Sequence, residues 1–176
     1  MRGGQQDVID SVLDGKDTLA IMPTGSGKSL CYQIPAKLLA GTTIVVSPLI
    51  SLMKDQTEKL LDLGVKATQL NSTLSADEER AALQGITERA HEIVFVTPER
   101  LAQAEFIETA KQVDISLIVI DEAHCISQWG HDFRPAYLEM ATSIKALGSP
   151  PILALTATAT DNVVDDIERQ LGRTHM

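Results

Sequence analysis

The fold is decided by one segment of the chain, Ile118-Val119-Ile120-Asp121-Glu122-Ala123-His124. It predicts a buried strand that ends in two adjacent carboxylates. Other short aliphatic runs recur along the chain, and each is apolar throughout rather than alternating with polar residues. They span residues 19–21, 44–46, 93–96, 117–120 and 152–155, with residues 67–70 as a weaker candidate. Continuous apolar runs are typical of strands buried on both faces, so we expect a mainly parallel sheet.

Amphipathic patterns lie between these runs and predict helices. One apolar face covers residues 8–13, and Ser75 with Glu78 forms a capping box that opens a helix to about residue 90. Further apolar stripes cover residues 137–147 and 163–171. Strands that alternate with helices predict an α/β fold with a helix-flanked sheet and right-handed crossovers. We assign residues 1–172 to one domain and interpret residues 173–176 as a frayed or vector-derived tail.

The composition narrows the class of protein. The 176 residues suit one domain, and 44% hydrophobic with only 3% aromatic residues predicts an aliphatic core. No apolar run is long enough for a membrane span and no signal peptide is visible, so we expect a cytoplasmic protein of the bacterial cytoplasm or nucleoid. The two cysteines match no zinc pattern. A net charge of −9 argues against nucleic-acid binding by bulk charge, so any strand contact must be a local patch.

A second informative segment spans residues 22–29, with the sequence Met-Pro-Thr-Gly-Ser-Gly-Lys-Ser. Glycines let the backbone N–H groups face a phosphate, and the helix that begins near Lys28 adds its positive end. Lys28 is expected to reach the β- and γ-phosphates, and Ser29 to ligate Mg²⁺. The strict phosphate-loop pattern would need glycine where Met22 stands, so an ordinary glycine-rich turn remains the alternative. The expected nucleotide-binding residues here are Thr24, Gly25, Ser26, Gly27, Lys28 and Ser29.

The carboxylates at residues 121 and 122 follow a strand, where ligands bind on parallel sheets. We expect Asp121 to hold Mg²⁺ through its water shell and Glu122 to polarise the attacking water. The alternative is a helix N-cap with acidic residues favoured by the helix dipole. His124 lies two residues from the proposed base, so a catalytic or coupling role is favoured over a purely structural one. Lys28, Asp121, Glu122 and His124 are thus the candidate catalytic set.

The motifs together resemble those of RecQ-type DNA helicases. The resemblance is most specific over residues 121–134, and residues 22–35, 46–56, 97–100 and 156–159 match further family segments in the family's order. It covers nearly the whole chain and implies a three-layer RecA-like P-loop domain, the first motor lobe of an ATP-dependent helicase that uses ATP and Mg²⁺. The resemblance also implies that Gln5 hydrogen-bonds the adenine edge and that Arg2 stacks on the base. The alternative for Gln5 is a solvated residue in a first helix turn.

The resemblance further implies that residues 128–134 form an aromatic-rich loop that links DNA binding to hydrolysis. Bases stack on aromatic rings with little sequence preference, although Trp129 and Phe133 could instead cover the sheet edge. Backbone contacts to DNA are expected just after strands, where turn and capping chemistry is the alternative. Thr156 and Thr158 are expected to couple hydrolysis to unwinding, or else to form a polar strand end. The DNA-contact or coupling set is Ser47, Pro48, Thr97, Pro98, Arg100, Gln128, Trp129, His131, Phe133, Arg134, Thr156 and Thr158.

The expected partners are single-stranded or partly duplex DNA and a second motor lobe that this chain lacks. That lobe carries the family's arginine finger, so we expect a monomeric fragment that binds ATP weakly and hydrolyses it hardly at all. The parent protein is expected to unwind DNA from 3′ to 5′ in repair and recombination. An RNA-remodelling motor and a nucleotide-binding interaction module without turnover remain the alternative functions.

Overall fold

The computed structural model describes residues 4–22, 28–88, 91–127, 133–157 and 159–173. Its centre is a sheet of six strands in the order β1-β6-β5-β2-β4-β3, and every described pairing is parallel. The strands are β1 (Thr18–Ile21), β2 (Thr42–Val46), β3 (Ala67–Leu70), β4 (Ile93–Val96), β5 (Ile115–Ile120) and β6 (Ile152–Thr156). The predicted strands are confirmed, including the weak candidate at residues 67–70, which is the edge strand β3.

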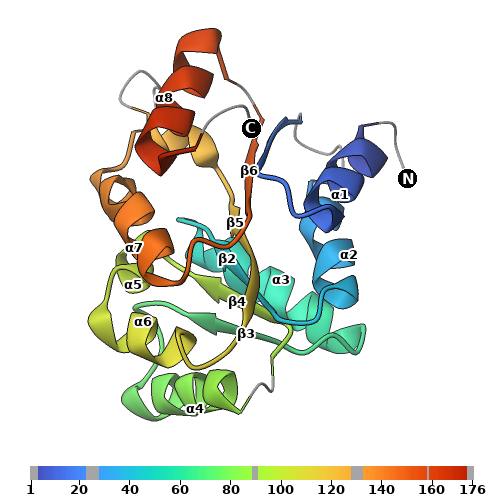
Figure 1. The fold of residues 1–176 in the computed structure, drawn as a ribbon. Helices are drawn as coiled ribbons and strands as arrows, with labels where there is room; N and C mark the ends of the chain where they lie inside the picture. Colours follow the sequence, from blue (N-terminus) through green and yellow to red (C-terminus); the bar gives the residue numbers. More distant parts are fainter. Residues whose placement is uncertain (1–3, 23–27, 89–90, 128–132, 158, 174–176) are drawn as a thin grey trace.

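Helices cover both faces of this sheet, so the predicted three-layer α/β architecture is confirmed (Figure 1). One face carries α1 (Gln5–Leu13), α2 (Leu30–Leu38) and α3 (Ile50–Asp62). The other carries α4 (Ala76–Thr87), α6 (Ala104–Ala110), α7 (Met140–Ala146) and α8 (Asp161–Leu171). The short helix α5 (Pro98–Leu101) and two 3₁₀ turns, η1 (Ala123–Ile126) and η2 (Pro135–Glu139), complete the described elements.

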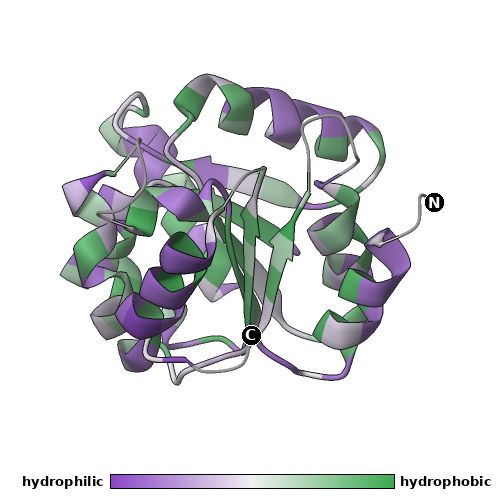
Figure 2. Ribbon diagram, turned by 90° about the horizontal axis from the view of Figure 1, so that it is seen from above, coloured by the Kyte–Doolittle hydropathy of each residue, from purple (hydrophilic) through white to green (hydrophobic). Residues whose placement is uncertain are grey.

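Successive strand residues feed two separate cores, because side chains alternate across a sheet. In β5, Ile118 and Ile120 pack toward α4, α6, α7 and α8, whereas Leu117 and Val119 pack toward α1, α2 and α3. All four side chains are fully buried. Seen from above, the hydrophobic strands lie between helices whose outer sides are hydrophilic (Figure 2). This two-sided burial explains why the strands lack polar alternation in sequence.

The register of the strands decides which residues meet at the carboxyl edge of the sheet. Val46 in β2 is opposite Ile120 in β5 and Val96 in β4. The ladder continues one residue further, since Asp121 N donates to Val46 O at 2.9 Å and Ser47 N donates to Val96 O at 3.0 Å. The polar residues that follow these strands therefore lie side by side at one edge.

Local signals set several helix ends as expected. The capping box of α4 is present, with Glu78 N donating to Ser75 Oγ at 3.1 Å and Ser75 N donating to Glu78 Oε1 at 3.0 Å. The helix ends at Thr87, a little before the predicted end near residue 90. The predicted helix over residues 137–147 is wrong in its first turn. Residues Pro135–Glu139 form the 3₁₀ turn η2, in which Tyr137 N donates to Arg134 O three residues back.

The carboxyl-terminal end of the described chain is held against the domain. Arg173 belongs to the segment 173–176 that the sequence suggested is a tail. It forms an ion pair with Asp17 at 2.7 Å and donates a hydrogen bond to Pro150 O at 3.2 Å. Asp17 also accepts a hydrogen bond from Ile152 N at the start of β6. The domain boundary at residue 172 stays a prediction. Among the described residues, no helix has the length and apolar character that a membrane crossing requires.

Because Asp17 joins the β6 backbone to Arg173, its truncation should destabilise the domain. We expect Asp17→Ala to lower the free energy of unfolding by about 1–3 kcal/mol, since it leaves a half-buried arginine and a backbone N–H without their acceptor. Asp14→Ala removes the same charge at an exposed helix end nearby and serves as the control. Chemical denaturation of both variants measures the difference, and equal stabilities would contradict the assignment.

Candidate active site

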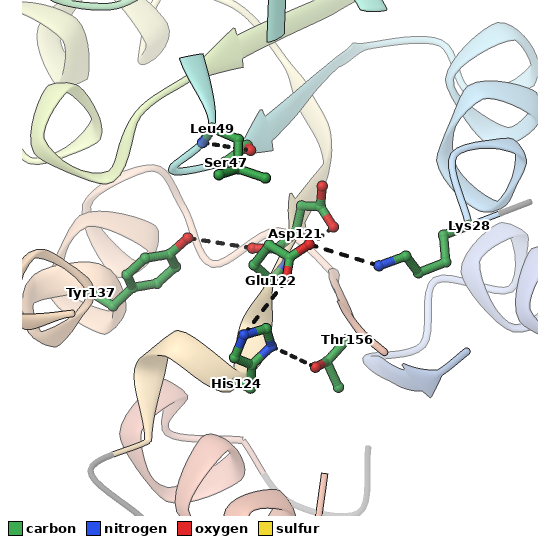
Figure 3. A network of polar contacts seen from close by, with 8 residues as sticks. All are labelled: Lys28, Ser47, Leu49, Asp121, Glu122, His124, Tyr137 and Thr156. Carbon is green, nitrogen blue, oxygen red and sulfur yellow. Dashed lines mark hydrogen bonds and ion pairs between the residues drawn. The ribbon is translucent and has the colours of Figure 1, made fainter. Parts of the chain in front are cut away.

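The site forms where the turn before α2 faces the end of β5. Lys28 Nζ lies 3.9 Å from Glu122 Oε1, and both side chains are largely buried. Figure 3 shows Lys28 extending toward the paired acids from one side, while His124 and Thr156 approach from below. The lysine-bearing turn and the acidic pair therefore converge on one place, as the sequence predicted.

A pocket of about 310 Å³ opens between these groups and the sheet. Its polar part can accept a charged ligand, and its apolar part consists of side chains from two neighbouring helices and three strands. It is lined by Lys28, Ser29, Ser47, Gln56, Asp121 and Glu122, and by Tyr32, Val45, Leu52, Met53, Phe95 and Leu155. The candidate ligands from two distant segments thus share a single cavity.

Glu122 adopts an unusual backbone conformation. Its φ of 54° and ψ of 45° lie in the left-handed region, although it is not glycine. The turn is held on both sides, since Glu122 N donates to Asp121 Oδ1 at 3.0 Å and Cys125 N donates to Glu122 O at 2.9 Å. Such a conformation costs about 1–3 kcal/mol and is concentrated at functional sites. Here it ends the strand abruptly and starts η1, so the Glu122 side chain can reach both Lys28 and His124.

Asp121 is a partly buried carboxyl group in a field of mixed charges. Burial raises its pKa above the ordinary value, and the Glu122 carboxylate raises it further. Lys28 opposes this shift, as do the backbone N–H of Glu122 and His124. Desolvation makes the charged form costly, so a cation beside Asp121 would stabilise the carboxylate.

The donor set of the pocket fits Mg²⁺ rather than a transition metal. Ser29 and Asp121 offer a hydroxyl and a carboxylate oxygen in the same cavity. Within the described part of the chain, no group of three or more His, Cys, Asp or Glu side chains could hold a metal ion. Mg²⁺ needs few protein ligands, because it keeps several waters and binds substrate phosphates directly.

His124 links the acidic pair to the neighbouring strand. Its Nε2 lies 3.5 Å from Glu122 Oε2, and its Nδ1 lies 2.7 Å from the hydroxyl of Thr156 at the end of β6 (Figure 3). Both His124 and Thr156 are buried. A contiguous path of polar contacts therefore runs from Lys28 through Glu122 and His124 to Thr156.

Two tyrosines near Asp121 were missed as site residues. Tyr137 donates its hydroxyl to Asp121 O at 3.4 Å, and Tyr32 lines the pocket. Burial raises the pKa of both hydroxyl groups above the ordinary tyrosine value, and the Asp121 carboxylate adds to each shift. The sequence placed Tyr137 in an apolar stripe. The hydroxyl group could have identified Tyr137 as a site residue, because a buried tyrosine O–H needs a hydrogen-bond partner.

The predicted strand-contact residues lie at the same sheet edge, where the capping alternative is also visible. Ser47 Oγ accepts from Leu49 N at 3.2 Å, and Thr97 Oγ1 accepts from Arg100 N at 3.4 Å. Pro98 is buried at the first position of α5. The hydroxyls of Ser47 and Thr97 thus cap turns, while contact with a nucleic acid stays a prediction for them and for Pro48.

The structure describes some of the remaining predicted site residues and leaves others outside the described part of the chain. Phe133 is half-buried, and Arg134 is exposed with its N–H bonded to Cys125 O at 2.9 Å. Gln5 is only 2% exposed, so its alternative interpretation as a solvated residue is wrong. The positions outside the described residues are Arg2, Thr24, Gly25, Ser26, Gly27, Gln128, Trp129, His131 and Thr158.

Comparison with known families agrees with this geometry. The pattern of the family described as DEAD/DEAH box helicase matches residues 2–167, which is most of the chain. The chain belongs to the DEAD/DEAH box helicase family. The Asp-Glu-Ala-His sequence at residues 121–124, with its left-handed glutamate, is therefore the DEAH segment of this chain.

Curated relatives support the resemblance to RecQ-type helicases. The chain is 52% identical to the ATP-dependent DNA helicase RecQ of Bacillus subtilis over 172 residues, covering 97% of this chain and 29% of that protein. It is 50% identical to the probable ATP-dependent DNA helicase RecS of the same organism, covering 98% of this chain and 34% of that protein. The chain thus spans about a third of the length of these relatives.

Solved structures confirm the fold. The helicase domain of Pyrococcus furiosus Hef superimposes with a TM-score of 0.72 at 23% identity, covering 99% of this chain and 37% of that one. The DUF1998 helicase MrfA, solved bound to DNA and AMPPNP, superimposes with a TM-score of 0.74 at 20% identity, covering 98% of this chain and 26% of that one. These similarities confirm the predicted RecA-like fold.

The backbone of Glu122 gives a direct test of the site geometry. Glu122→Gly and Glu122→Ala both remove the carboxylate, but only glycine relieves the left-handed conformation. We expect the glycine variant to be more stable than the alanine variant by about 1 kcal/mol in chemical denaturation. The same two substitutions at Glu58, an exposed position inside α3, should show the opposite order of stability, with the alanine variant more stable. An alanine variant as stable as the glycine variant would rule out the strained turn.

Proposed function

We propose that this chain is the first motor lobe of an ATP-dependent DNA helicase that moves from 3′ to 5′ along single-stranded DNA. The observation that carries the proposal is the convergence of Lys28 with the DEAH carboxylates around one pocket. Membership of the DEAD/DEAH box helicase family supports the proposal, as do the sequence identities of 52% to RecQ and 50% to RecS of Bacillus subtilis. The whole activity requires a second lobe, which is consistent with the share of those relatives that the chain spans.

In this proposal the pocket binds the triphosphate of Mg²⁺-ATP. Residues 23–27 would wrap the β-phosphate with backbone N–H groups, and Lys28 would neutralise the β- and γ-phosphates. Ser29 and Asp121 would hold Mg²⁺, which neutralises charge that develops on the phosphoryl oxygens. Partial burial disfavours an unpaired carboxylate at Asp121, so a neighbouring cation would stabilise this group more than it would a solvated carboxylate.

Glu122 would act as the general base, and its ion pair with Lys28 suggests how it is kept inactive before ATP binds. At 3.9 Å the pair is long and readily exchanged. A γ-phosphate that takes Lys28 would leave Glu122 free to orient and polarise a water molecule. The base would therefore become available only when the nucleotide is in place.

The contact from His124 to Thr156 would couple hydrolysis to strand movement. His124 touches the proposed base on one ring nitrogen and the end of β6 on the other. Thr156 leads directly to residues 157–159, which match a coupling segment in the resemblance. A shift of Glu122 on hydrolysis would thus be transmitted to the neighbouring strand end.

The DNA strand would run along the carboxyl edge of the sheet, past the ends of β2 and β4. Ser47, Pro48, Thr97, Pro98 and Arg100 line this edge and would contact the sugar–phosphate backbone. The aromatic-rich loop of residues 128–134 would stack on bases and report strand binding to the DEAH segment. Because the net charge is −9, binding must depend on these local groups.

Adenine would be read by the amino-terminal segment, with Gln5 bonding the base edge and Arg2 stacking on it. Burial of Gln5 supports this role, because a buried amide is held in one orientation. In this proposal the second lobe supplies the arginine finger, so this lobe alone would be a monomer with weak ATP binding and little turnover. In the cell the parent protein would act in the cytoplasm in DNA repair and recombination.

ATPase assays on this chain and on one extended to the length of the RecQ relatives test the proposal. We expect single-stranded DNA to stimulate turnover only in the extended chain. Lys28→Ala should abolish activity, whereas Glu122→Gln should bind ATP normally and lose about 100-fold or more in turnover. Stimulation by RNA but not DNA would indicate an RNA-remodelling motor. No turnover in either chain would indicate a binding module.

The coupling path is tested by a matched pair of threonine variants in the extended chain. Thr156→Val removes the hydroxyl that contacts His124, so we expect ATP binding to persist while DNA stimulation falls about 10-fold. Thr43→Val is the control, because Thr43 Oγ1 is buried in β2 without a hydrogen-bond partner among the described residues. That variant should keep its DNA stimulation and be at least as stable. Equal stimulation in both variants would remove Thr156 from the coupling path.

A further inference from the structure

Arg100, a cation at the proposed strand-binding edge, is already paired with a carboxylate. Its Nη1 lies 2.6 Å from Glu79 Oε1 and also donates to the side chain of Gln103. The Arg100 side chain is only 16% exposed and that of Glu79 only 23%. Exposed ion pairs are weak because water and salt screen them, but this pair is largely shielded.

Glu79 reaches Arg100 from a different helix. It lies in the first turn of α4, next to Glu78, whose carboxylate completes the capping box. Successive helix residues point about 100° apart, so Glu79 projects from a different side of α4 than Glu78, and its carboxylate meets Arg100 of α5. Figure 1 shows α4, α5 and α6 on the same side of the sheet. The helix cap therefore does not require Glu79, and its contact with Arg100 needs another explanation.

The ion pair with Glu79 changes how Arg100 can bind a phosphate. A guanidinium carries five N–H donors, and the contacts with Glu79 and Gln103 both use Nη1, so a phosphate can still approach the other nitrogens. It would then share one cation with a carboxylate a few ångströms away. Two anions at one guanidinium repel each other, and the shielding of the pair from water strengthens that repulsion.

We propose that Glu79 is a negative regulator of strand affinity that holds Arg100 in an ion pair which a DNA phosphate must share or displace. This inference rests on the proposed function, since it assumes that the strand passes Arg100. Its consequence is a phosphate contact that is weaker than an unpaired arginine would make. A motor that steps along DNA has to release each contact, and a carboxylate that competes for the cation favours release.

The competing explanation is that Glu79 and Arg100 only join α4 to α5. The two explanations differ in what the charge of Glu79 does. Glutamine at position 79 keeps the carbonyl oxygen that accepts from Arg100 and removes the negative charge. A structural tether would lose some stability and leave DNA affinity unchanged, whereas a competitor for phosphate would raise DNA affinity when neutralised.

The test is a fluorescence-anisotropy titration of a labelled oligo(dT) with the chain extended to the length of its RecQ relatives. We expect Glu79→Gln to lower Kd about threefold to tenfold at low salt, with a smaller gain at high salt. Asp77→Asn is the matched control. It removes the same charge from the same helix turn, but Asp77 is 91% exposed and pairs only with Arg80 among the described residues. We expect it to change Kd less than about twofold.

The Arg100→Gln background completes the test. In that background, Glu79→Gln should no longer lower Kd. The slope of log Kd against log salt should fall by about 0.7, the value of one phosphate contact on a single strand. An unchanged Kd in Glu79→Gln, or an equal gain in Asp77→Asn, would overturn the role of Glu79 while leaving DNA binding intact. Failure of the parent chain to bind the oligonucleotide at all would instead overturn the proposed function and this inference with it.

Discussion

The hydrogen-bonded register of the central parallel strands is the constraint on which the rest of the structure depends. Val46 O of β2 accepts from Asp121 N, and Val96 O of β4 accepts from Ser47 N. These bonds extend the ladder one residue past the strands and fix the first polar residue of each. A slip of one residue would turn the carboxylate of Asp121 to the other face of the sheet. The geometry of the pocket is therefore a property of the backbone ladder.

The second constraint is the left-handed turn at Glu122. The strand delivers Asp121 to the edge, but an extended continuation would carry Glu122 to the opposite face, because side chains alternate. The turn lets two adjacent acids contribute to one pocket, with Lys28 and His124 both within reach of Glu122. Local strain is accepted because the flanking hydrogen bonds and the fully buried Ala123 hold the turn in place.

The polar contacts at the edge share a pattern in which cations are already paired with carboxylates. Lys28 pairs with Glu122, and Arg100 pairs with Glu79. In both cases a phosphate would compete with a carboxylate of the protein for the cation. An acidic domain with a net charge of −9 is suited to such exchange, because its excess of carboxylates repels phosphate away from such cations.

The sequence by itself determined the strands, the helix-flanked sheet and the place of the candidate site. Uninterrupted aliphatic runs such as residues 117–120 have one physical solution, burial on both faces, and the Ser75 capping box is a purely local interaction. Motif spacing placed Lys28 and the acidic pair at strand ends, which meet because parallel strands share their carboxyl edge. The same local reasoning could not fix strand order, which follows from packing between segments far apart in the chain.

Only the tertiary structure decided how individual side chains are used. Gln5 is buried rather than solvated, Tyr137 belongs to a 3₁₀ turn and contacts the backbone of Asp121, and Arg100 is held by a glutamate from another helix. Each of these outcomes depends on a partner that lies beyond the reach of a helix or strand period. Sequence patterns report which face a residue occupies, whereas the partner on that face is set by how the layers pack.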